Sequence, residues 1–116
     1  YPENGKKYLW PELQTHFPPA KDPLNKDEMI ERILFIQAIE TIRAYEENVV
    51  TSVADANIGS IFGWGFAPVK GGTLQFVNDY GIQEFEKRSQ ELAKKYGERF
   101  NPPKMLKEMA SKKEMF

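Results

Sequence analysis

The chain has 116 residues, 16 basic and 17 acidic side chains and a net charge of −1, which predicts one domain and gives no charge argument for binding nucleic acid. It contains no cysteine, so disulfides and thiolate metal sites are excluded, and no apolar run approaches the length of a membrane span. We expect a cytoplasmic protein, and the start at Tyr1 without a methionine leads us to expect a fragment of a longer chain.

Residues 1–25 are predicted to form an extended arm or linker. Five of the eight prolines lie there: Pro2, Pro11, Pro18, Pro19 and Pro23. Proline at this density excludes long helices and inner strands. The same segment carries large apolar side chains, including Tyr1, Tyr8 and Trp10. We therefore expect an ordered strap that lies over another surface, with Trp10 as a candidate interface residue.

The remainder, residues 26–116, reads as one helical domain. A first helix over 26–47 is preceded by Asn25 as a potential N-cap, with Glu28 placed to complete a capping box. Its apolar residues surround most of the helical wheel, which predicts the central helix of the core. Ser52 and Asp55 predict the start of a second helix over 53–62.

Three further helices are expected after a glycine-rich segment. Thr73 is predicted to cap a helix that ends at Tyr80, and a helix over 82–96 follows Gly81 with an apolar stripe on one side. The pairs Glu84–Arg88 and Glu91–Lys95 should point outward. A last short helix carries Leu106 and Met109. No segment has a strand pattern, so the class is all-α, a bundle of about five helices with an extended arm.

The segment 63–72 holds four of the eight glycines together with two aromatic residues and is predicted to be a packed corner between helices. The structural glycines are expected to be Gly63, Gly65, Gly71 and Gly72. Candidate interface residues there are Phe62, Trp64, Phe66, Pro68 and Lys70. A phosphate-binding loop is the alternative, but the segment lacks a preceding strand and a GK[ST] ending, and Lys70 would be its anion contact.

Other polar residues favour structural roles. His16 is the single histidine, and a lone histidine makes neither a metal site nor a catalytic triad. Glu31 and Glu40 lie on the helix expected to be buried, so each needs a partner, for which Arg32 and Arg43 are candidates. The sequence therefore predicts no catalytic, cofactor-binding or metal-ligating residue in this chain.

The spaced motifs resemble the C-terminal helical domain of 3-hydroxyacyl-CoA dehydrogenases. They are Glu31-Arg32-Ile33-Leu34, Glu40-x-x-Arg43, Ser52-x-x-Asp55-Ala56, Gly63-x-Gly65-Phe66-x-Pro68-x-Lys70-Gly71-Gly72, and Tyr96-Gly97-x-Arg99-Phe100-x-Pro102-Pro103. More narrowly, residues 26–116 resemble the second of two tandem helical repeats in multifunctional fatty-acid oxidation proteins, which also carry an enoyl-CoA hydratase domain. The resemblance implies a fold like the C-terminal domain of 6-phosphogluconate dehydrogenase.

The resemblance also implies a division of labour within a parent enzyme that oxidises (3S)-hydroxyacyl-CoA with NAD in fatty-acid β-oxidation. In this family NAD and the catalytic histidine–glutamate pair belong to a Rossmann domain, and the catalytic helical repeat adds an asparagine in an Asn-Arg pair. This chain has Glu31 before Arg32 at that position. The resemblance thus implies a non-catalytic repeat whose partners are the first helical repeat and the Rossmann domain, forming a pseudo-dimer, while acyl-CoA is the parent's substrate.

Two alternatives stay open. The chain could be a stand-alone interaction module, or an acyl-CoA-binding helical bundle that uses Lys70 and the basic C-terminal region for the CoA phosphates. A homodimer of the isolated chain would fit an uncovered pseudo-dimer surface.

Overall fold

The computed structural model describes residues 5–22 and 24–116 and confirms the all-α class; within these residues there is no strand. The helices are α1 (Leu13–His16), α2 (Lys26–Glu46), α3 (Val53–Trp64), α4 (Thr73–Tyr80), α5 (Ile82–Tyr96) and α6 (Lys104–Lys112). Two short 3₁₀ turns, η1 (Pro68–Lys70) and η2 (Glu98–Phe100), lie between them. No helix in the described part of the chain is long and apolar enough to cross a membrane.

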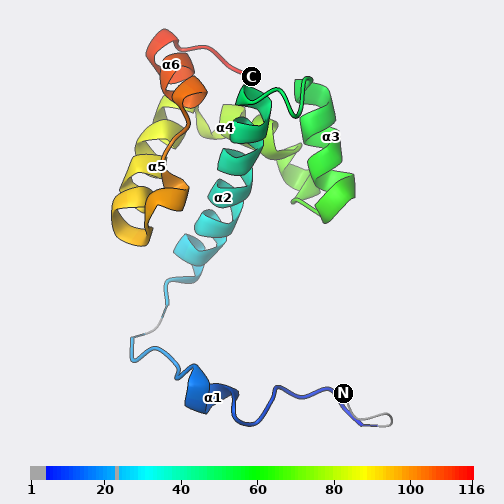
Figure 1. Cartoon of the computed structure of the whole chain (residues 1–116), viewed down its shortest axis with the longest axis vertical. Coiled ribbons are helices and arrows are strands. Elements are labelled where there is room, and N and C mark those ends of the chain that lie inside the picture. Colours follow the sequence, from blue (N-terminus) through cyan, green and yellow to red (C-terminus); the bar gives the residue numbers. More distant parts are fainter. Residues whose placement is uncertain (1–4, 23) are drawn as a thin grey trace.

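Helix α2 runs through the middle of the helical body, with α3 on one side and α5 and α6 on the other (Figure 1). Helix α4 packs against α2, α3 and α5. The middle of α2 is buried as predicted, and its Phe35 ring stacks on Phe85 of α5 with ring centroids 4.1 Å apart. The first half of α2 differs from the prediction, because no neighbouring helix covers its outer side: Met29 is 39% and Ile33 57% exposed.

The side chains of Asn25 and Ser52 cap α2 and α3 as predicted. The Asn25 Oδ1 atom accepts hydrogen bonds from the backbone N–H groups of Asp27 and Glu28 at 3.0 and 3.1 Å, and the Ser52 Oγ atom accepts one from Asp55 at 3.3 Å. Glu28 does not complete a capping box. Its carboxylate instead accepts hydrogen bonds from the Lys95 ammonium group on α5, the shorter at 2.7 Å.

The prediction that Thr73 caps α4 is wrong, because the cap comes from α3. Gly72 is the N-cap residue and has no side chain, and Thr73 is the first helical residue. The Asn57 Oδ1 atom accepts hydrogen bonds from the backbone N–H groups of Leu74 and Gln75 at 2.9 and 3.0 Å. Ser60 Oγ accepts a third from Thr73 at 3.2 Å. Two helices are thereby joined through the free N–H groups at one helix end.

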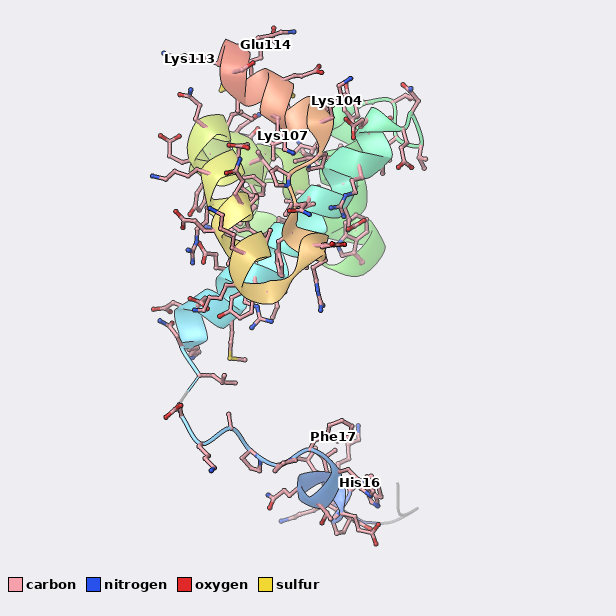
Figure 2. All side chains as sticks on the ribbon, turned by 60° about the vertical axis from the view of Figure 1, so that its left-hand side comes forward. His16, Phe17, Lys104, Lys107, Lys113 and Glu114 are labelled. Carbon is pink, nitrogen blue, oxygen red and sulfur yellow. The ribbon has the colours of Figure 1, made fainter. Side chains whose placement is uncertain are left out.

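The arm projects from the N-terminal end of α2 and does not lie along the helical body (Figures 1 and 2). Within its described residues the arm has one helix, α1. His16 at the end of α1 and the following Phe17 are exposed, and His16 stacks on Trp10 with ring centroids 5.1 Å apart. The arm therefore does not cover the helical body of its own chain, as a strap on that surface would. Tyr1, Pro2 and Pro23, which contributed to that prediction, lie outside the described residues.

Candidate functional site

The glycine-rich segment is a tight connection between α3 and α4. Gly65, Gly71 and Gly72 have φ angles of 79°, 72° and 109°, which disfavour residues with a Cβ atom. Gly72 also makes the close helix contact possible, since a Cβ atom there would lie 2.4 Å from the Asn57 Cα atom. Gly63 differs from the other three because it lies inside α3 and its φ angle is not positive; a Cβ atom there would have no neighbour within 4 Å.

The candidate interface residues separate into one core residue and several exposed ones. Phe66 is 1% exposed and belongs to the core, so it is not available for an interface, which corrects its assignment. Phe62 is 85% and Trp64 57% exposed, and the Trp64 Nε1–H donates to Gln37 Oε1 at 2.9 Å. Pro68 and Lys70 are exposed on η1. The Lys70 Nζ atom lies 5.7 Å from the centroid of the Phe76 ring, a cation–π distance.

A groove of about 540 Å³ opens between α2 and α3. It forms because α4 packs against both helices while α2 and α3 make little direct contact. We call it the α2–α3 groove. Its walls on α2 and the following loop are Ile36, Gln37, Glu40, Thr41, Ala44 and Val50, and those on α3 are Asp55, Ala56, Gly59, Ser60, Gly63 and Trp64. The α3 wall consists largely of small residues. The negative charge of the groove comes from the carboxylates of Glu40 on α2 and Asp55 on α3.

The α2–α3 groove continues along α2 toward its N-terminal end. Ile36 also lines a second hollow of about 250 Å³, together with Met29 and Ile33 of α2 and Arg99 and Phe100 of η2. Residues 29, 33, 36 and 40 are spaced three and four apart and therefore share one side of the helix. Met29, Ile33 and Ile36 thus form an apolar strip of α2 that is flanked by α3 and η2, is open to solvent and ends at the charged Glu40.

A second cleft, of about 520 Å³, is dominated by an ion pair. Glu31 of α2 lines it with Tyr80 of α4 and Arg88 of α5. The Arg88 Nε–H and Nη2–H groups donate to the two Glu31 carboxylate oxygens at 2.9 and 2.6 Å, and the Tyr80 hydroxyl donates at 3.3 Å. The Glu31 carboxylate raises the pKa of Arg88 above its usual value, and burial followed by the charge of Glu31 raises the pKa of Tyr80.

These contacts correct the predicted ion pairs. The partner of Glu31 is Arg88, not Arg32 or Arg43. The predicted pairs Glu84–Arg88 and Glu91–Lys95 are replaced by contacts of Arg88 with Glu91, at 2.9 Å, and of Lys95 with Glu28.

The two arginines proposed as partners bind elsewhere. Arg32 lies over the Tyr96 ring, with its Cζ atom 3.8 Å from the centroid. Arg43 pairs with Glu40, as anticipated, and also donates to the backbone carbonyl groups of Arg99 and Asn101 at 3.3 and 3.0 Å.

The described residues contain no group of three or more histidine, cysteine, aspartate or glutamate side chains that could hold a metal ion. The carboxylate of Glu31 is engaged by a guanidinium and a hydroxyl group and is not positioned as a free base.

Three features of these clefts were not predicted from the sequence: Arg88 as the partner of Glu31, Asn57 as the cap of α4, and the α2–α3 groove. The groove had a sequence signal, since Ala56, Gly59 and Gly63 recur at three- and four-residue spacing. The other two contacts join residues 57 and 17 positions apart and carry no local pattern. A scan against models of known protein families finds no match for this chain.

Proposed function

We propose that this chain is a non-catalytic helical domain of the 3-hydroxyacyl-CoA dehydrogenase type, and that it packs against the catalytic helical repeat of an NAD-dependent β-oxidation enzyme. The observation that carries the proposal is the open apolar strip along α2 and the α2–α3 groove beside it. A monomeric domain has no internal use for such a strip, whereas a helical partner would cover it.

The ion pair of Glu31 supports the non-catalytic role. The resemblance places an asparagine of the catalytic repeat at this position, where a neutral amide can contact the substrate. Here the side chain is a carboxylate that accepts two hydrogen bonds from Arg88 and one from Tyr80. Such a group serves to join α2 to α4 and α5, and releasing it for substrate would leave Arg88 without its main partner.

The glycines of α3 support close packing of a partner helix. Gly59 and Gly63 both line the α2–α3 groove, and a Cβ atom at either position would have no neighbour within 4 Å. Glycine inside a helix costs about 1 kcal/mol relative to alanine, and in the described part of the chain no close contact at Gly59 or Gly63 requires it. A partner that approaches the backbone closely would account for both residues.

Two measurements test the proposal. The chain alone should give no turnover of acetoacetyl-CoA with NADH, and measurable turnover would contradict a non-catalytic role. The chain should also bind a 3-hydroxyacyl-CoA dehydrogenase fragment that contains the Rossmann domain and the first helical repeat. A Gly59→Leu variant should lose this binding and Val69→Ser should keep it, because Val69 is 90% exposed and lies on η1. Absence of binding by the unmodified chain would refute the proposed packing.

A further inference from the structure

The arm is a second apolar surface that the chain itself does not cover. Four of its large side chains are mostly exposed: Tyr8 (65%), Leu9 (80%), Trp10 (53%) and Phe17 (72%). Trp10 is held on α1 by its stack on His16 and by a hydrogen bond from the Leu13 N–H to its carbonyl oxygen at 3.0 Å. The arm therefore presents a small structured knob, and a concave apolar surface is the complement such a knob requires.

The arm is directed away from the groove of its own chain. It leaves the N-terminal end of α2, and α1 lies beyond that end, on the side away from the helical body (Figures 1 and 2). Pro18 and Pro19 follow Phe17 directly, and adjacent prolines stiffen a chain in an extended conformation. A stiff spacer disfavours folding back onto the same chain and leaves the arm available to a second chain, and exchange of a segment is a low-cost route to a dimer.

The area available in such an exchange matches that of a stable dimer. A fully buried aromatic side chain removes about 150–250 Å² from solvent, and Tyr8, Trp10 and Phe17 are 65%, 53% and 72% exposed, so together they contribute about 300–500 Å² per arm. Two arms contribute about 600–1,000 Å², and the groove surface that they cover adds a comparable area. Specific interfaces typically bury about 1,200–2,000 Å² in total.

The charges of the two surfaces are weakly complementary. Lys6, Lys7 and Lys21 lie on either side of the aromatic residues of the arm, and Glu12 and Asp22 belong to the same segment. In the α2–α3 groove Glu40 is paired with Arg43, which leaves Asp55 as the remaining carboxylate among the lining residues. A weakly positive arm thus meets a weakly negative groove, which favours correct orientation on encounter.

We propose that two copies of this chain exchange arms, so that the Trp10 knob of each copy occupies the α2–α3 groove of the other. The exchange is reciprocal and closes as a two-fold dimer, which leaves no groove open for further growth. This inference goes beyond the proposed function and does not depend on the enzyme family. The arm covers the groove where no catalytic repeat is present, and the repeat would compete with it.

The test is sedimentation equilibrium of the 116-residue chain across concentrations, with circular dichroism to verify folding. The unmodified chain should dimerise reversibly. Trp10→Ser in the arm and Gly59→Leu in the groove should each raise the dissociation constant at least about 30-fold, the effect of losing a central aromatic contact. Neither change should unfold the domain, because Trp10 belongs to the arm, which projects from the helical body (Figure 1), and a Cβ atom at Gly59 meets no atom within 4 Å. Val69→Ser is the matched control and should leave the constant unchanged.

Mixing the two variants provides the decisive measurement. The Trp10→Ser chain keeps an intact groove and the Gly59→Leu chain keeps an intact arm, so one native arm–groove contact can form between them. The mixture should therefore dimerise more tightly than either variant by itself. Tryptic cleavage within the arm should slow as the concentration of unmodified chain rises.

Three results would overturn arm exchange, and each is distinct from failure of the proposed function. A chain that stays monomeric with a readily cleaved arm shows that the Trp10 knob has no binding site on a second copy. A monomer whose arm is protected at every concentration shows that the arm closes on its own chain. A dimer that survives Trp10→Ser associates through the α2 strip without the arm, a result that would still agree with the proposed pseudo-dimer surface.

Discussion

Substituting alanine at two glycines should change stability in opposite directions. We expect Gly72→Ala to lower the free energy of unfolding by at least about 3 kcal/mol and Gly59→Ala to raise it by about 1 kcal/mol. Both residues lie near the contact of α3 with α4, and composition does not distinguish them. Their backbone angles and neighbours do.

The magnitude for Gly72 follows from two costs. Its φ of 109° and ψ of 173° lie in a region used almost only by glycine, which costs an alanine about 1–3 kcal/mol. The new Cβ atom would also lie 2.4 Å from Asn57 Cα, so α3 and α4 must separate. Separation weakens the hydrogen bonds from Leu74 and Gln75 to Asn57, each worth about 1 kcal/mol. Gly59 has neither cost, and alanine there gains helix propensity.

Urea denaturation followed by circular dichroism at 222 nm measures both changes. The melting temperature of a domain of this size changes by about 4–8 °C for each kcal/mol of stability. It should therefore fall by more than about 10 °C for Gly72→Ala and rise by several degrees for Gly59→Ala. Gly63→Ala is a second control of the stabilising kind. A Gly72→Ala variant within 1 kcal/mol of the unmodified chain would refute the close-contact argument, as would a clearly destabilised Gly59→Ala.

Three further predictions concern polar contacts. Asn57→Ala should destabilise the domain by about 1–2 kcal/mol. Asn57→Asp should cost much less, because aspartate keeps the acceptor for the N–H groups of α4. Equal losses of stability for the two variants in denaturant melts would contradict the capping role. Arg88→Met should lower the stability by about 1 kcal/mol or less at low ionic strength, because the side chains of Arg88 and Glu31 are 29% and 22% exposed. This loss of stability should shrink in 1 M NaCl. A loss of stability that does not change with salt would show that the effect is packing. The hydrogen bond from Lys95 lowers the pKa of Glu28 below its ordinary value of 4.5, so its stabilisation is present at neutral pH and is lost as the pH falls through that lowered pKa. The difference in melting temperature between the unmodified chain and Glu28→Gln should therefore vanish in acid, and a difference that grows on acidification would be the wrong sign.

The helices could be predicted because their signals are local. Asn25 and Ser52 cap helices through side-chain contacts two or three residues away, and such contacts are visible in sequence spacing. The apolar stripe of α5 is of the same kind, with Phe85 and Leu92 both buried. Thr73 misled the prediction, because a capping residue type at the right position does not reveal that another helix already supplies the acceptor.

The candidate site could be predicted only in part. Phe62 and Trp64 are predicted as candidate interface residues, and both are exposed. Phe66 lies two residues from Trp64 yet is buried, because the turn at Gly65 directs the chain back toward α4. The spacing of aromatic residues in the sequence does not show which of them point into the core, because one residue with a positive φ angle changes the direction of the chain.

By itself the sequence determined the helical class, the helix boundaries to within about two residues and the absence of thiol chemistry. These depend on propensity, capping and composition, which act between neighbours in the chain. The tertiary structure alone decided which charges pair, which face of α2 stays open and which glycines are indispensable. These depend on the placement of α3, α4 and α5 around α2, where contacts between distant residues compete and geometry selects among them.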